Sequence, residues 1–247
     1  MCCAGGSLTK SGMIRGVLFD KDGTLLDYWQ TWGPINRDVA RFAAGLDPIL
    51  ADDLLRLGGH DPASDHITPG SVLAAGSHDE VATLFAGRLG ARTPPNLALE
   101  IERIFREGGA RHAVLMDGVR PVLDALRCAG LRLGVATNDS AGGLAASLGR
   151  HAGLIERFEF LAGCDSGHGA KPGPGMAMAF ARATGLKPAE IAVVGDAVHD
   201  LEMGRRAGVG LKIGVLGGTS AHADLAPHAD LVLDHLSQLP AALGHCT

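Results

Sequence analysis

Long hydrophobic runs are missing from the 247-residue sequence, and no stretch approaches the length that a membrane-spanning helix needs. The N-terminal segment MCCAGGSLTKSGMIRG has basic residues but no apolar region, so we expect no secretory signal peptide. Positive charge is also scarce, because 22 lysines and arginines face 27 acidic residues, for a formal net charge of −5. Nucleic acids and anionic membranes attract proteins with a basic surface, so neither is an expected partner.

Cysteine is infrequent and scattered. The five cysteines form no CxxC pair and their number is odd, which argues against a cysteine metal site and a disulfide framework. With no signal peptide expected, this pattern predicts a reduced, cytoplasmic compartment. The eleven histidines show no HExxH or HxH spacing, so a histidine metal site is not expected either.

Short apolar runs are what the sequence does contain, and each ends at a polar residue or a glycine. They lie at 16–20, 131–137, 159–162, 191–196, 209–215 and 229–233. Near-continuous apolar runs of this length are typical of parallel strands that are covered on both faces. Helical patterns lie between them, at 118–129, 141–148, 174–184 and 200–207. The alternation predicts an α/β fold with a Rossmann-like parallel sheet and right-handed crossovers.

The alternation of strands and helices breaks between the first and second apolar runs. Apolar residues recur there at helical spacing, and no convincing strand is present. We therefore expect an all-helical domain at residues 28–115, inserted into an α/β core formed by 13–27 and 116–247. Residues 1–12 are expected to be a flexible tail.

Acidic residues mark the carboxyl ends of two predicted strands. The first strand ends in Asp20, with Asp22 two residues later in the segment FDKDGT; a later strand ends in Asp196, with Asp200 following. In an open parallel sheet, ligands bind outside the carboxyl ends of the strands. Carboxylates gathered at that edge would be costly without a cation. Their oxygens suit Mg²⁺, which retains several waters and shares phosphate oxygens with a substrate.

These positions also predict a chemistry. Asp20 is placed to act as a nucleophile, because a carboxylate that attacks phosphorus gives an aspartyl-phosphate. Asp22 is placed to protonate the leaving alkoxide and later to deprotonate the hydrolytic water. Thr137 and Asn138 end the second strand, and Lys171 lies in the loop after the third. We expect these three side chains to hold the oxygens of the transferred phosphoryl group.

Four short segments carry a resemblance to a known family. In chain order, FDKDGTL, ATN, KP and GDAVHD resemble the motifs of the haloacid dehalogenase-like hydrolases, and the sequence is most similar to their phosphoglycolate phosphatase-like branch. The resemblance covers about residues 14–235. It implies that Asp20 is the nucleophile, that Asp22 is the acid and base, and that Thr137 and Lys171 bind the phosphoryl group.

The same resemblance implies a metal site and a moving domain. Mg²⁺ would be bound by Asp20, the backbone carbonyl of Asp22, and Asp196. Asp200 would be a supporting acid, acting through water or by orienting Lys171. The helical insert would be a cap that closes over the substrate.

The activity expected from this resemblance is Mg²⁺-dependent hydrolysis of a phosphate monoester. An acidic residue at Asp22 favours phosphoryl transfer, because dehalogenases and phosphonate-cleaving relatives have no acid at that position. The expected substrate is a small phosphorylated metabolite, either phosphoglycolate-like or a sugar phosphate, bound by a monomer or a homodimer.

Two alternatives and two departures stay open. A phosphosugar mutase would use the same core, and a non-catalytic phosphometabolite-binding protein would use the same site without turnover. A nucleotide-binding module is disfavoured, because GxxxxGK[ST] is missing. Lys21 stands where an apolar residue is commoner in the branch. Trp29 and Trp32 add aromatic bulk that either packs within the insert or faces the substrate.

Overall fold

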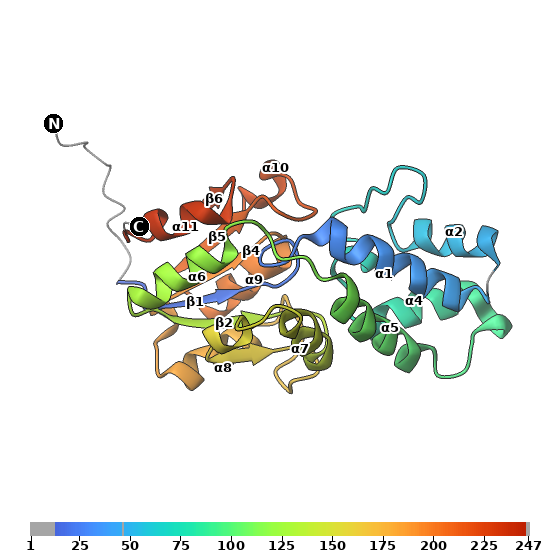
Figure 1. Cartoon of the computed structure of the whole chain (residues 1–247), viewed down its shortest axis with the longest axis horizontal. Helices are drawn as coiled ribbons and strands as arrows, with labels where there is room; N and C mark the ends of the chain where they lie inside the picture. The colour runs from blue at the N-terminus through green and yellow to red at the C-terminus, as the bar shows by residue number, and fades with distance from the viewer. Residues whose placement is uncertain (1–12, 46, 246–247) are drawn as a thin grey trace.

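The computed structural model describes residues 13–45 and 47–245 (Figure 1). The predicted tail, residues 1–12, lies outside the described residues. Six strands form one sheet in the order β3-β2-β1-β4-β5-β6, and every neighbouring pair is parallel. The strands are β1 (Gly16–Phe19), β2 (Arg132–Ala136), β3 (Phe160–Ala162), β4 (Ile191–Gly195), β5 (Leu211–Val215) and β6 (Leu231–Leu233).

Helices cover both faces of this sheet. They are α6 (Val119–Cys128), α7 (Ala141–Gly149), α8 (Gly175–Thr184), α9 (Val198–Ala207), α10 (His222–Leu225) and α11 (Leu239–Ala242), with short 3₁₀ turns η2 (Ile155–Arg157), η3 (Pro188–Glu190) and η4 (Leu236–Gln238). Alternate residues of a strand point to opposite faces. Val17 and Phe19 therefore pack with α6, α7 and α11, whereas Leu18 packs with α8 and α9. These two buried clusters account for the near-continuous apolar runs in the sequence.

The secondary-structure elements of the insert after β1 are all helices. It contains α1 (Tyr28–Ala43), α2 (Pro48–Leu57), α3 (Val72–Ala75), α4 (His78–Leu89), η1 (Gly90–Arg92) and α5 (Leu97–His112). The helices enclose an apolar core of their own, in which Ile35, Leu54, Phe85 and Ile101 are fully buried. Figure 1 shows them as a separate group beyond the carboxyl ends of the strands.

Two chain segments connect the insert to the sheet, and they run side by side. The Asp27 N–H donates to the Val114 carbonyl (2.8 Å), and the Met116 N–H donates to the Leu25 carbonyl (3.0 Å). Helix α5 of the insert also packs against α7 of the α/β part. The insert is therefore held directly over the edge where the predicted site residues lie.

The α/β fold class with a helical insert is confirmed. The observed strands begin or end one or two residues inside most of the predicted runs, and residues such as Asp20, Thr137 and Asp196 lie in the loops that follow. Among the described residues, no helix combines the length and the apolar character needed to cross a membrane. The exact domain limits at residues 27–28 and 115–116 stay a prediction.

Candidate active site

Three adjacent strands bring the first site residues together. Thr137, Asp20 and Asp196 directly follow β2, β1 and β4, which are neighbours in the sheet. The Asp20 N–H donates to the Val194 carbonyl (2.8 Å), and the Thr137 N–H donates to the Ala162 carbonyl (3.0 Å). These bonds continue the strand ladder past its end, so the backbone of both residues is fixed by the sheet itself.

Lys171 reaches the same point from the loop before α8. Its Nζ contacts Asp20 Oδ1, lies 2.6 Å from Asp200 Oδ1 and donates to the Ala136 carbonyl (3.0 Å). Burial alone would lower the pKa of Lys171, but the carboxylates of Asp20 and Asp200 raise it. The ammonium therefore stays charged and links the first strand to α9.

Asp20, Asp196 and Asp200 form a buried acidic cluster whose carboxylate oxygens lie within 4.8 Å of one another. Burial raises the pKa of Asp20 to about 7, and Lys171 offsets this only in part. Burial and the two neighbouring acids raise the pKa of Asp196 well above its ordinary value. For Asp200, burial is outweighed by Lys171, so its pKa is lowered.

The oxygens of this cluster differ in what they already bind. Lys171 occupies one oxygen of Asp20 and one of Asp200, and the second oxygen of Asp200 accepts a backbone N–H after β4 (3.1 Å). Asp196 accepts one backbone N–H, from the loop after β5, at 3.3 Å. Asp20 and Asp196 therefore keep oxygens for a cation, whereas Asp200 is committed to protein groups. This donor set fits a hard divalent metal, and such an ion would relieve the repulsion that raises the pKa of Asp196.

Two glycines allow the chain to approach Asp196 closely. A Cβ atom at Gly218 would overlap Asp196 Oδ2, and one at Gly23 would lie 2.7 Å from the same oxygen. Gly23 also has φ +80°, a conformation that side chains other than glycine rarely adopt. The loops after β1 and β5 therefore fix the position of the Asp196 carboxylate from both sides.

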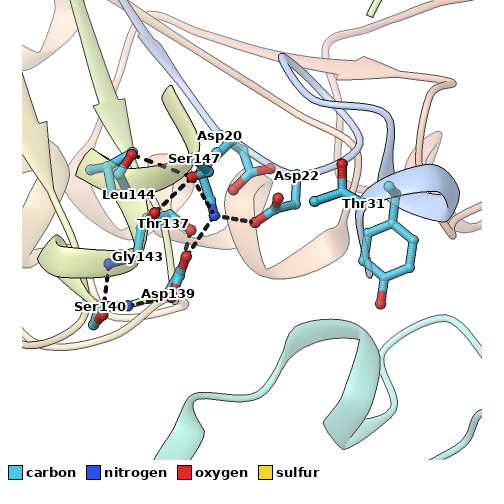
Figure 2. A network of polar contacts seen from close by, with 12 residues as sticks. Asp20, Asp22, Thr31, Thr137, Asp139, Ser140, Gly143, Leu144 and Ser147 are labelled. Atoms are coloured by element: carbon cyan, nitrogen blue, oxygen red, sulfur yellow. Dashed lines mark hydrogen bonds and ion pairs between the residues drawn. The ribbon is translucent and has the colours of Figure 1, made fainter. Parts of the chain in front are cut away.

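Lys21 points into the protein from the FDKDGT segment. Its Nζ lies 2.6 Å from Asp139 Oδ2, 3.1 Å from Asp22 Oδ2 and 3.4 Å from Ser147 Oγ. Figure 2 shows the side chains of Asp22, Asp139 and Ser147, which approach one another from separate segments of the chain. The Nζ also lies 5.3 Å from the centre of the Trp32 ring. Burial would lower the pKa of Lys21, but Asp139 and Asp22 raise it, so a charged lysine joins Asp22 to the start of α7.

Asp22 is partly exposed and lines the cavity at the strand ends. Its Oδ1 has no hydrogen-bond partner among the described residues. Burial raises the pKa of Asp22, and Lys21 offsets this only in part. A carboxyl group with a raised pKa and one unpaired oxygen is suited to exchanging a proton with a bound molecule.

We predict that Lys21→Met lowers the free energy of unfolding by about 3–5 kcal/mol, because Asp139 would be left buried without its counter-charge. Urea denaturation measures this change, and the double variant Lys21→Met/Asp139→Asn should recover part of it. A matched control is Lys212→Met, which breaks a more exposed pair with Asp230 and should cost about 0–1 kcal/mol. Equal losses in Lys21→Met and Lys212→Met would contradict the buried ion pair.

The residues after β2 connect three loops. The Thr137 hydroxyl accepts the Asp139 N–H (3.1 Å). The Asn138 side chain accepts the Lys171 N–H (2.8 Å) and donates to the carbonyls of Lys171 (3.2 Å) and Ala75 (3.1 Å). The side chain of Asn138 thus holds the Lys171 loop and touches the insert, while the Thr137 side chain lines the cavity.

The two tryptophans have different surroundings. Trp32 is buried, packs edge to face with Phe105 at 4.8 Å, and lines the cavity at the strand ends together with Tyr28. Trp29 is 39% exposed and stacks on His66. Of the two alternatives left open by the sequence, Trp32 does both: it packs within the insert and faces the site.

Several lining residues escaped sequence reasoning. His199, Thr219 and the segment 72–76 also line the cavity at the strand ends. His199 lies between Asp196 and Asp200 in GDAVHD, which is a signal that could have suggested it. The other two come from the loop after β5 and from the insert, where no motif marks them.

Comparison with known proteins gives a consistent picture. A family model described as haloacid dehalogenase-like hydrolase matches residues 14–208. The chain is 31% identical over 232 residues to N-acetylmuramic acid 6-phosphate phosphatase from Pseudomonas putida, covering 92% of this chain and 94% of the relative. It is 28% identical to phosphoglycolate phosphatase from Salmonella typhimurium, covering 94% and 93%. The crystal structure of a predicted phosphoglycolate phosphatase from Haemophilus somnus aligns with a TM-score of 0.69 at 19% identity, over 94% of this chain and 98% of that one.

Proposed function

We propose that this chain, which belongs to the haloacid dehalogenase-like hydrolase family and is a phosphoric monoester hydrolase, cleaves a small phosphate monoester. The proposed reaction uses Mg²⁺ and passes through an aspartyl-phosphate on Asp20. Phosphoglycolate-like esters and sugar phosphates are the substrate classes suggested by the relatives' names. The observation that carries the proposal is the Asp20–Lys171–Asp200 contact beside Asp196 at the ends of adjacent strands.

The first half-reaction transfers the phosphoryl group to the protein. Lys171 and the cation would share Oδ1 of Asp20, which leaves the other carboxylate oxygen to form a bond to phosphorus. As the bond between phosphorus and the ester oxygen breaks, Asp22 gives its proton to the leaving alkoxide. Thr137 and Lys171 are placed to hold the phosphoryl oxygens, and Asn138 keeps the Lys171 loop in position.

The second half-reaction restores the carboxylate. Asp22, now ionised, removes a proton from a water molecule that attacks phosphorus, and the bond between phosphorus and Asp20 breaks. Inorganic phosphate leaves, and Asp22 is again protonated for the next cycle. The raised pKa of Asp22 supports this double use as acid and base.

Asp20, Asp196 and the backbone carbonyl of Asp22 are the proposed Mg²⁺ ligands, with Asp200 orienting Lys171. The ion would neutralise negative charge on the phosphoryl oxygens. The helical insert is the proposed cap, since Tyr28 and Trp32 reach the cavity that Asp20 lines. Its closure would exclude bulk water from the phosphorylated enzyme. A cytoplasmic location and a monomeric or homodimeric state remain predictions.

The direct test of this function is turnover of p-nitrophenyl phosphate with Mg²⁺ and after EDTA treatment. The proposal predicts release of inorganic phosphate that stops with EDTA and returns when Mg²⁺ is added in excess. A non-catalytic binding protein would show no turnover under either condition, and turnover that resists EDTA would remove the metal from the proposal.

A Gly218→Ala variant is expected to need at least about tenfold more Mg²⁺ for half-maximal activity, because the new methyl group displaces the Asp196 carboxylate. A Mg²⁺ titration of the initial rate measures the change. Gly87→Ala is the matched control, since a Cβ atom there meets open space in α4. An unchanged Mg²⁺ requirement in Gly218→Ala would contradict the role of Asp196.

Metal and protons should compete for the acidic cluster. The pKa of Asp20 rises from 3.8 to about 7 on folding, so the folded protein binds more protons in that range and the stability of the metal-free protein falls as pH increases through it. Asp196 adds to this effect in the same direction. Mg²⁺ at 100 times its Kd stabilises by about 2.7 kcal/mol.

Thermal unfolding should therefore show a larger Mg²⁺-induced increase in Tm at about pH 7.5 than at about pH 5, where protons occupy the carboxylates. Scans with Mg²⁺ and with EDTA at both pH values measure this. The Asp196→Asn variant should lose most of the increase. An increase that is equal at both pH values would show that these carboxyl groups are not the ligands.

A further inference from the structure

The cavity at the strand ends has an inner and an outer part. The inner part, of about 50 Å³, is lined by Asp20, Thr137 and Asp196, and is large enough only for a small group. An outer cavity of about 490 Å³ adjoins it, since Val72 and Lys171 line both. A volume of several hundred Å³ is typical of small-molecule sites. If the phosphoryl group occupies the inner part, the outer cavity is the adjoining space that can take the alcohol portion of the substrate.

The insert presents an uncharged surface to the inner part. Trp32, Phe105 and the segment 72–76 (VLAAG) supply aromatic, aliphatic and backbone atoms there. Tyr28 adds a hydroxyl group, but that group already donates to the Leu73 carbonyl (2.8 Å). The cap side of the inner part therefore offers no charge to the substrate.

The positive charge at the site is already committed to two carboxylates and to the phosphoryl group. Among the described residues that line the two cavities, Lys171 is the one lysine or arginine, and its ammonium is bound by Asp20 and Asp200. His199 lines both cavities, but its Nε2 faces Asp200 Oδ1 at 3.4 Å. A carboxylate on the alcohol portion of a substrate would find no free cation here.

The outer cavity adds negative charge instead. Glu80, Glu202 and Asp224 line it. Glu80 and Asp224 form no ion pair among the described residues, while Glu202 pairs with Arg205 and Arg206, which lie outside the lining. Glu80 and Asp224 are exposed, so a nearby carboxylate on the substrate would be repelled by them through partly screened charges.

We propose that the substrate is a phosphate monoester whose alcohol portion carries no negative charge, so that the site excludes phosphoglycolate and other acidic esters while accepting neutral ones. This inference rests on the proposed phosphatase function and narrows its substrate class. It separates this chain from relatives named for phosphoglycolate and for N-acetylmuramic acid 6-phosphate, whose alcohol portions are acids.

Matched pairs of esters test the inference. 2-Hydroxyethyl phosphate and 2-phosphoglycolate differ by a carboxylate, as do N-acetylglucosamine 6-phosphate and N-acetylmuramic acid 6-phosphate. We expect kcat/KM to be at least about tenfold higher for the neutral member of each pair. This preference should shrink as the salt concentration rises, because ions screen the repulsion. p-Nitrophenyl phosphate serves as the reference for basal turnover.

A variant with an added positive charge shows whether electrostatic repulsion causes the preference for neutral esters. Val72→Lys places an ammonium at the junction of the two cavities, and Val72→Met supplies a side chain of comparable length without charge. Val72→Lys should shift the ratio of acidic to neutral turnover by at least about tenfold towards the acidic ester, and Val72→Met should leave the ratio unchanged.

Three results would overturn the inference. Equal kcat/KM within each pair would show that the acids of the outer cavity do not select, while the phosphatase function would stand. A preference that Val72→Lys does not alter would show that charge is not its cause. No turnover of any ester, including p-nitrophenyl phosphate, would remove the proposed function and this inference together.

Discussion

Asp20→Asn is expected to abolish phosphate release, with a loss in kcat on the order of 10⁶-fold, the scale seen when a covalent nucleophile is removed. An amide oxygen is a poor nucleophile and cannot form the aspartyl-phosphate. The fold should remain intact, because Lys171 keeps its contacts with Asp200 and the Ala136 carbonyl. Steady-state kinetics with a phosphate-release assay measures the loss, and thermal unfolding checks the fold.

The control for this variant is Asp52→Asn, which changes an exposed carboxylate on α2 and should retain full activity. The Asp20→Asn protein should also be at least as stable as the parent at neutral pH without metal, since burial disfavours the charged form of Asp20. If Asp20→Asn kept most of its turnover while folded, the nucleophile would have to be another residue.

Asp22→Asn is expected to lower kcat by about 10²–10⁴-fold for alkyl phosphates, because the leaving alkoxide would have no proton donor. The loss should be smaller for the first step with an aryl phosphate such as 2,4-dinitrophenyl phosphate, whose leaving group needs no proton. A burst of the phenol followed by slow turnover would then appear, since the second step still needs a base. Rapid-mixing absorbance measurements with the aryl ester detect the burst.

The dependence on the leaving group distinguishes acid–base catalysis from a structural effect. A general disturbance of the site around Lys21 and Asp139 would slow alkyl and aryl esters by the same factor. An equal loss for both kinds of ester, with no burst, would therefore contradict the assignment of Asp22.

The sheet and its polar edge could be predicted from sequence because both depend on local patterns. The run ending at Asp20 and the run ending at Asp196 are short, apolar and followed by acids, and the positions of adjacent strands bring their ends together. The role of Lys171 could be predicted because the segment KP stands third in the order of the four motifs. Its contacts with Asp20 and Asp200 depend on the fold, and no sequence spacing gives them.

Contacts between distant segments account for what the sequence did not reveal. The Lys21–Asp139 pair joins residues 118 positions apart, and neither residue type is expected to be buried without a partner that only the fold supplies. Trp32 could be assigned to the cavity only once α1 was placed over the strand ends. The cavity-lining segment 72–76 consists of a short helix and the glycine after it, with no distinctive residue type.

Chemical trapping of the phosphorylated enzyme would detect the aspartyl-phosphate on Asp20 itself. The protein would be mixed with substrate and Mg²⁺, quenched in acid within the first turnover and reduced with borohydride, which converts an acyl phosphate to an alcohol. Peptide mass spectrometry should then find homoserine at position 20, in an amount that falls to zero when substrate or Mg²⁺ is left out. An unmodified Asp20 in protein quenched during active turnover, or the modification at another carboxylate, would contradict the account.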